Sequence, residues 1–96
     1  MDRRSYPRSF LVFARALEEL ERLLNAGYRP LVKVEGYMIK TGEEVTLTGV
    51  ASSVRLSEDV TAFVLESGGT RYSVGGFDAE LEDVEATRVT IMDITK

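Results

Sequence analysis

Residues 43–56, EEVTLTGVASSVRL, alternate apolar and polar positions, but the alternation changes phase at Gly49. Apolar residues occupy odd positions before this glycine, at Val45 and Leu47, and even positions after it, starting with Val50. Side chains of a strand alternate between its two faces, so one inserted residue exchanges the faces, and glycine tolerates the backbone of such a β-bulge. We therefore expect a long strand that bends at Gly49 and changes partners there, as a corner of a small barrel requires.

A single amphipathic helix is predicted upstream, over residues 9–27, after a basic tail at residues 1–8. Ser9 can cap the start of this helix, and Gly27 suits the left-handed residue that ends it. The apolar residues recur at spacings of three and four, the period of a helix with one buried face: Phe10, Phe13, Leu17, Leu20 and Leu24. We expect this helix to cover the strands that follow.

The rest of the chain, residues 30–95, is predicted to be a β-barrel because its apolar pattern has a period of two. VTAFVLES, residues 60–67, is apolar on both faces, as expected of a central strand that is covered on both sides. FDAELEDVE, residues 77–85, has apolar residues at helical spacing and predicts a short helix before the last strand, TRVTIMDI. The expected fold is one α+β domain over residues 1–96, mostly β, in which an N-terminal helix precedes a five-stranded antiparallel barrel.

Three segments carry a resemblance to a known fold: VTLTGVASSV, TAFVLESGGTRYSVGGF and DAELEDVE. They give a long bent strand with a glycine in its middle, a hairpin to a second strand, a third strand, and a short helix before a further strand. Over residues 43–94 this order resembles the OB-fold, with residues 31–39 supplying the fifth strand. The resemblance implies single-stranded nucleic acid as a ligand, bound across the face of the second and third strands.

GGTRYSVGGFD, residues 68–78, supports a different comparison. Together with a helix ahead of five strands, it is similar to the Sm-like barrel, whose glycine-rich stretch also ends in Phe-Asp. The strands would then close as an Sm-like barrel instead of an OB-fold, and an open curved sheet is a third arrangement.

The composition limits the chemistry that this chain can perform. It has no cysteine and no histidine, which excludes disulfides and thiolate metal ligands and removes the commonest general base. Paired carboxylates, or Ser52 or Ser53 with a lysine, could still act in catalysis, but they form no recognisable motif. A run of five acidic residues lacks the spacing of an EF-hand loop, and we interpret it as a solvated face: Asp78, Glu80, Glu82, Asp83 and Glu85. We expect no enzyme, no metal site and no cofactor.

Charge is distributed unevenly along the chain, whose net charge is −4. Residues 1–30 carry six basic and four acidic groups, whereas residues 31–96 carry six basic and twelve acidic groups. Such an acidic body repels the phosphates of duplex DNA, so non-specific binding to it is disfavoured. Few thermolabile residues among many charges suggest a thermophilic source. No apolar signal-peptide core follows MDRRSYPRS, and we expect a cytoplasmic protein.

Our first functional hypothesis is a non-catalytic accessory module of a nucleic-acid-handling system that binds single-stranded DNA or RNA weakly. A base could stack on Tyr37, a contact that contributes about 1–3 kcal/mol per base, while scattered cations follow the backbone. The candidate residues are Tyr37, Lys33, Lys40, Arg55 and Arg71, with Arg3, Arg4 and Arg8 of the tail. The alternative is that these are solvated positions on amphipathic strands, where Glu35, Glu43 and Glu44 cancel much of their field.

The second hypothesis is a protein-interaction adaptor or subunit that self-associates or docks through the helix. The first two turns of the helix are apolar over more than half of their surface, and a small barrel has limited need for so much cover. The candidate contact residues are Phe10, Leu11, Val12 and Phe13. The alternative is that this whole surface packs on the barrel.

Overall fold

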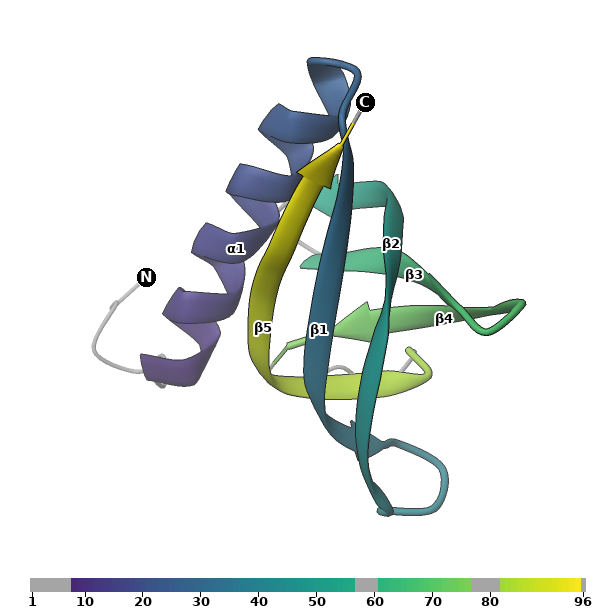
Figure 1. Ribbon diagram of the computed structural model, residues 1–96. Coiled ribbons are helices and arrows are strands. Elements are labelled where there is room, and N and C mark those ends of the chain that lie inside the picture. Colours follow the sequence, from purple (N-terminus) through teal and green to yellow (C-terminus); the bar gives the residue numbers. More distant parts are fainter. Residues whose placement is uncertain (1–7, 57–60, 77–81, 96) are drawn as a thin grey trace.

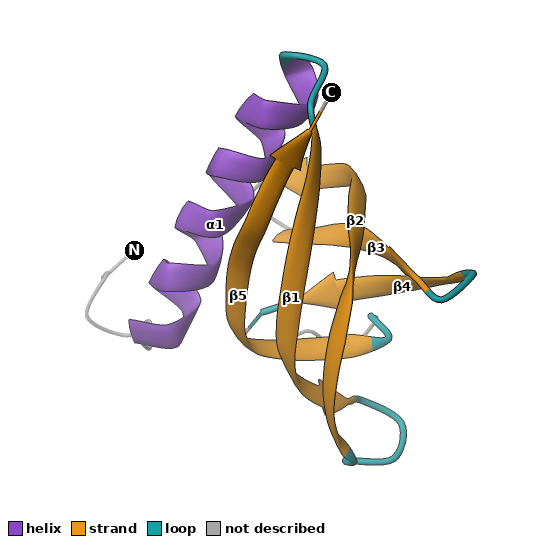
Figure 2. Ribbon diagram, in the orientation of Figure 1, coloured by secondary structure: helices purple, strands orange, loops and turns teal. Residues whose placement is uncertain are grey.

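The computed structural model describes residues 8–56, 61–76 and 82–95, without the side chains of residues 8–12. In chain order its elements are α1 (Arg8–Asn25), β1 (Arg29–Met38), β2 (Glu44–Leu56), β3 (Thr61–Ser67), β4 (Thr70–Gly75) and β5 (Val84–Thr95) (Figures 1 and 2). The predicted N-terminal helix followed by five strands is confirmed. In the part of the chain described, no helix is both long enough and apolar enough to cross a bilayer.

The five strands follow one another in chain order around a closed barrel, and β5 returns to pair with β1. Among the described strands, all neighbouring pairs are antiparallel except β4 and β5. These two run parallel through two register pairs, Val74 with Val84 and Gly75 with Glu85. The predicted antiparallel arrangement is therefore only partly correct. The OB-fold is a Greek-key barrel, whereas in this barrel every strand lies next to the strand that follows it in the chain. The strand order therefore does not confirm the resemblance to the OB-fold, which stays a prediction.

β2 joins the two layers of the barrel. Its first half, from Glu44 to Val50, pairs with β1, and its second half, from Val50 to Leu56, pairs with β3. Figure 1 shows β5, β1 and the first half of β2 running side by side in front, while β3 and β4 cross behind them. The predicted change of partner is confirmed. Strands that pass between layers in this way make the corners of orthogonally packed sheets.

The extra residue of β2 lies later in the strand than the sequence predicts. Pairing with β1 runs evenly through Gly49, and the register shift falls between Ala51 and Ser53 in the ladder with β3. Val50 therefore stays on the outer face opposite Leu31, although the sequence pattern placed it inside. Gly49 itself is buried on the inner face. Its pairing with Val32 of β1 is regular, because the register shift comes later in the strand.

The short helix predicted before the last strand is wrong for the residues that the structure describes. Val84, which helical spacing placed on the apolar side of that helix, starts β5, and Glu82 and Asp83 form a bend. Residues 77–81 lie outside the described part. Asp83 is bound to β4 instead, because its N–H donates to the carbonyl of Ser73 at 2.9 Å and its Oδ2 accepts from the N–H of Ser73 at 2.9 Å.

The core lies between α1 and the inner faces of the strands, and α1 runs alongside β5 (Figure 1). The helix contributes Phe13, Leu17 and Leu20, and the strands contribute Val32, Val34, Ala51, Phe63, Leu65, Val74, Val84 and Ala86. The ring of Phe13 lies 6.2 Å from that of Phe63. It also fills space left by Gly76, where an added Cβ would come within 2.7 Å of the Phe13 ring. This packing fixes the helix to the end of β4.

Candidate interaction surface

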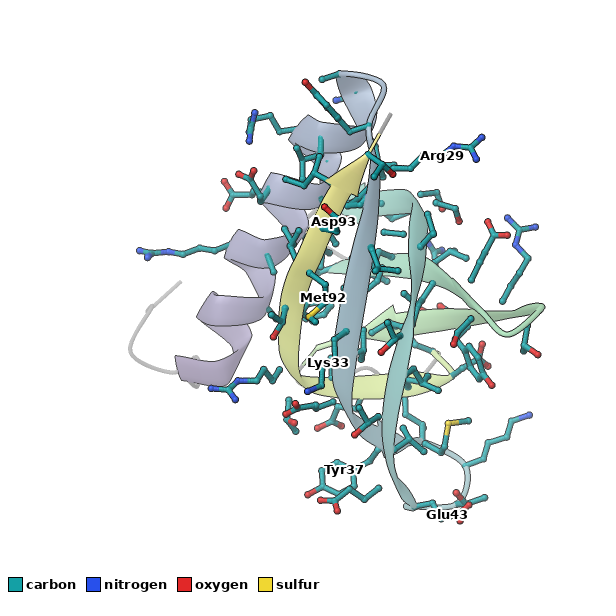
Figure 3. The ribbon with its side chains drawn as sticks, in the orientation of Figure 1. Arg29, Lys33, Tyr37, Glu43, Met92 and Asp93 are labelled. Atoms are coloured by element: carbon teal, nitrogen blue, oxygen red, sulfur yellow. The ribbon has the colours of Figure 1, made fainter. Side chains whose placement is uncertain are left out.

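The outward side of β2, β1 and β5 forms an exposed surface, here called the front face. Side chains alternate across a strand, so on β1 this face consists of Arg29, Leu31, Lys33, Glu35 and Tyr37. The residues paired with these belong to the same face: Val50, Thr48, Thr46 and Glu44 on β2, and Thr95, Asp93, Thr90, Arg88 and Glu85 on β5. Figure 3 views the molecule from this side.

Three apolar side chains, here called the apolar row, cross the front face: Val50, Leu31 and Met92. Val50 and Leu31 are register partners, and Leu31 is 36% exposed. The register of β1 and β5 shifts beside Leu31, which leaves Met92 as an extra residue, 55% exposed. Such a bulge re-aims the side chains around it, and both Met92 and Asp93 are exposed here. Single exposed apolar residues are normal on a protein surface, whereas contact sites typically carry contiguous apolar patches.

The front face carries charges of both signs. Lys33 Nζ lies 3.3 Å from Glu35 Oε1, so these two charges compensate each other. Arg29 and Asp93 lie next to the apolar row, and within the described residues neither has an ion-pair partner. Asp93 Oδ1 accepts a hydrogen bond from the N–H of Ile94 at 2.8 Å, which holds the carboxylate in place.

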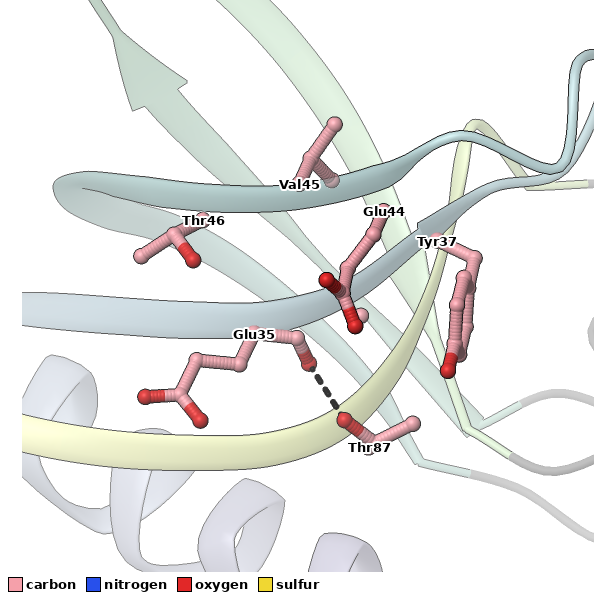
Figure 4. Close-up of a pocket in the computed structure, with 7 residues that line it drawn as sticks. Glu35, Tyr37, Glu44, Val45, Thr46 and Thr87 are labelled. Carbon is pink, nitrogen blue, oxygen red and sulfur yellow. Dashed lines mark hydrogen bonds between the residues drawn. The ribbon is translucent and has the colours of Figure 1, made fainter.

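A hollow of about 270 Å³ lies at the Tyr37 end of the front face (Figure 4). It is lined by Glu35, Gly36, Tyr37, Glu44, Val45, Thr46 and Thr87. Thr87 Oγ1 donates to the backbone carbonyl of Glu35 at 3.1 Å, a contact that ties β5 to β1. Over the described ranges of the chain, no group of three His, Cys, Asp or Glu residues is arranged to hold a metal ion. By its lining residues, the hollow offers carboxylates, threonine hydroxyls and one tyrosine ring to a ligand.

Two of the predicted nucleic-acid-binding residues, Lys33 and Tyr37, lie on the same side of β1. Lys40 lies in the turn between β1 and β2, and Arg71 lies on β4, which belongs to the other layer of the barrel. The structure therefore does not gather these cations into one surface.

Arg55, a further predicted nucleic-acid contact, is 59% exposed but is engaged in an ion pair with Glu82. Its Nη2 lies 3.5 Å from Oε1 of Glu82, whose side chain is 12% exposed. The hydroxyl of Ser73 donates a hydrogen bond to the same carboxylate. Glu82, together with Asp83, thus anchors the start of β5 to its neighbours. The assignment to a solvated acidic face is wrong for Glu82, whereas Asp83 is exposed.

Most of the candidate residues of the basic tail and of the first turns of α1 lie outside the described part of the structure. Arg3 and Arg4 lie outside the described residues, as do the side chains of Arg8, Phe10, Leu11 and Val12. Phe13, the last predicted partner contact, is 3% exposed and packs on Phe63. This residue therefore has almost no surface to offer a partner.

The apolar row was missed from the sequence, although part of its signal was present. Leu31 shares the parity of Lys33 and Glu35, so an apolar residue stands on a strand face that is otherwise polar. Met92 directly follows the inward Ile91 and breaks the alternation of the last strand. Asp93 carries no such signal, because its place beside Leu31 depends on the register of β5 against β1.

A known protein family extends over most of this chain. Residues 5–93 match the model of the family described as TrmB/TrmBL1, EBD C-terminal subdomain. The matched range contains α1, all of β1 to β4, and β5 as far as Asp93, so it includes the apolar row. No curated protein matches the chain.

Proposed function

Because the chain belongs to the family described as TrmB/TrmBL1, EBD C-terminal subdomain, we propose that it is a non-catalytic binding module of a regulator that acts through contact with another protein unit. The family description names a subdomain, which is a unit that forms part of a larger domain. Such a unit needs a surface that packs on a second folded unit. On this chain the front face with its apolar row is suited to that role.

One observation carries the proposal: Leu31 and Met92 are exposed next to each other on adjacent strands. Each Å² of apolar surface removed from water contributes roughly 25 cal/mol, so a partner that covers both side chains gains affinity. The absence of histidine and cysteine supports a binding role over a catalytic one.

Site-specific photo-cross-linking tests this proposal. A photoreactive amino acid replaces Met92 in one variant and Arg71, an exposed residue of β4, in a matched control. After irradiation of cells that produce each variant, mass spectrometry identifies the adducts. We expect protein adducts at position 92 well above those at position 71. Equal yields at the two positions would contradict a protein contact on the front face.

Weak binding of single-stranded nucleic acid by an OB-like barrel is a second candidate function. It is favoured by the shared side of Lys33 and Tyr37 on β1. Two acidic residues oppose it, because Glu44 on β2 and Glu85 on β5 are the register partners of Tyr37. A base stacked on that ring would place its phosphates close to both carboxylates, which is unfavourable.

Titration of labelled single-stranded DNA and RNA at two salt concentrations separates the two candidates. Protein contact alone predicts no binding at low salt, and the same result after Tyr37→Ala. Binding that weakens as salt rises, and weakens again in Tyr37→Ala while Ser53→Ala, at an exposed position outside the hollow, leaves it unchanged, would favour the nucleic-acid candidate.

A further inference from the structure

We propose that the partner of the front face is a second copy of this chain. The two copies meet across a two-fold axis, with their apolar rows in contact and Arg29 of each opposite Asp93 of the other. This inference rests on the proposed function, because it names the protein that docks on the same surface.

The apolar row supplies the centre of the contact. Val50, Leu31 and Met92 lie on three adjacent strands, so they span the full width of the front face. A two-fold contact uses the same patch on both copies, and each exposed side chain is therefore covered in both. Thr48 and Thr90, the register partners of Lys33, are short residues that leave the approach open.

Charge complementarity favours a second copy as the occupant. In a two-fold contact, when residue i touches residue j of the partner, j also touches i. A patch fits itself when it carries an unpaired cation and an unpaired anion that are displaced from its centre in different directions. Arg29 lies along β1 from Leu31, and Asp93 lies across from it on β5 (Figure 3). Two copies would therefore form two Arg29–Asp93 pairs.

A partner that is strongly basic or strongly acidic fits the apolar-row end of the front face less well than a second copy does. The surroundings of the apolar row are balanced, with Arg29 and Asp93, whereas Glu44 and Glu85 flank Tyr37 at the other end. A basic partner would be attracted to the Tyr37 end. An anionic partner finds no excess of cations at either end of the described front face.

Sedimentation velocity over a concentration series of the whole chain tests the inference. The wild-type chain should form a dimer. Arg29→Glu and Asp93→Arg should each weaken it at least about tenfold, because like charges then face each other. Asp93→Asn keeps the acceptor for the N–H of Ile94 and should weaken it less. Arg71→Glu makes the same change of charge on β4 and should leave the dimer unchanged. Circular dichroism verifies the fold of each variant.

An equimolar mixture of the Arg29→Glu and Asp93→Arg proteins gives the most specific test of the contact between Arg29 and Asp93. In the mixed dimer each of the two contacts again joins opposite charges, so association should return although neither variant dimerises well alone. Rescue in the mixture requires a contact between chains and cannot arise within one chain.

Two outcomes overturn the inference: a wild-type chain that is monomeric at every concentration, or a mixture no more associated than its components. If position 92 then still cross-links to a different protein, the proposed function stands and only the identity of the partner is wrong. A monomeric chain without protein adducts at position 92 overturns both.

Discussion

The backbone carbonyl oxygen of Glu66 occupies the space that a side chain at Gly49 would need: a Cβ on this glycine would lie 2.0 Å from it. Gly36 stands in the same relation to the carbonyl oxygen of Glu85, also at 2.0 Å. Both glycines are buried on the inner face of the barrel. They are required by the close approach of a neighbouring strand.

Gly49→Ala should lower the free energy of unfolding by about 3 kcal/mol or more, because the added methyl group fits only if the backbone of β3 moves. Urea unfolding followed by circular dichroism measures the change. Thr48→Ala, at the exposed neighbouring position, is the control and should stay within about 0.5 kcal/mol of wild type. Equal stability of the two variants would mean that β3 does not approach Gly49 so closely.

Gly36→Ala should destabilise the other close approach, between β1 and β5, by a similar amount. Gly42→Ala is the matched control, since Gly42 has a φ of 74° and nothing within 4 Å of an added Cβ. Its cost comes from backbone strain alone, about 1 kcal/mol. The melting temperature of Gly36→Ala should therefore be lower than that of Gly42→Ala, and the reverse order would contradict the close approach of β5 to Gly36.

Phe13→Ala should cost about 3–5 kcal/mol, because it removes a buried ring that packs between Phe63 and Gly76. The measurement is urea unfolding at low protein concentration, where association contributes little. Arg15→Ala, on the exposed side of the same helix, should have almost no effect. A small loss of stability in Phe13→Ala would contradict the burial of this ring and would again make Phe13 a candidate partner contact.

Ser73→Ala should cost about 1–2 kcal/mol, since it removes a hydroxyl that donates to the largely buried carboxylate of Glu82. Arg55 would then be the remaining side-chain partner of that carboxylate among the described residues. Ser53→Ala, an exposed serine of β2, serves as the comparison in the same unfolding experiment. If both variants lose equally little, the contact between Ser73 and Glu82 does not help to close the barrel.

The elements of the fold were predictable because their signals are local. Val32 and Val34 alternate with Lys33 and Glu35, and the structure buries the first two and exposes part of the others as that pattern requires. The position of the bulge was not predictable, because Val50 is apolar and yet lies on the outer face. Its side is set by pairing with β1, a partner that is distant in sequence.

The prediction of a short helix over residues 77–85 was wrong in its described part for a related reason. Val84 has helical spacing from the apolar residues before it, but it pairs with Val74 on β4. The hydrogen bonds of Asp83 with Ser73 reinforce that pairing. Contacts between segments thus override the local period.

The candidate surface was predictable only in part. The sequence places Lys33 and Tyr37 on one side of a strand, and the structure agrees. It could not show that Glu44 and Glu85 flank Tyr37, or that Asp93 lies beside Leu31, because both facts depend on register between strands.

Val50 has register partners on both of its sides, Leu31 on β1 and Glu66 on β3. A protein that docked on the apolar row would therefore contact a residue that is held by both layers of the barrel at once. Moving it would disturb its pairing with β1 in the front layer and with β3 in the layer behind. A partner would thus meet a residue whose position is already fixed by two strands, and little conformational freedom would be lost there on binding.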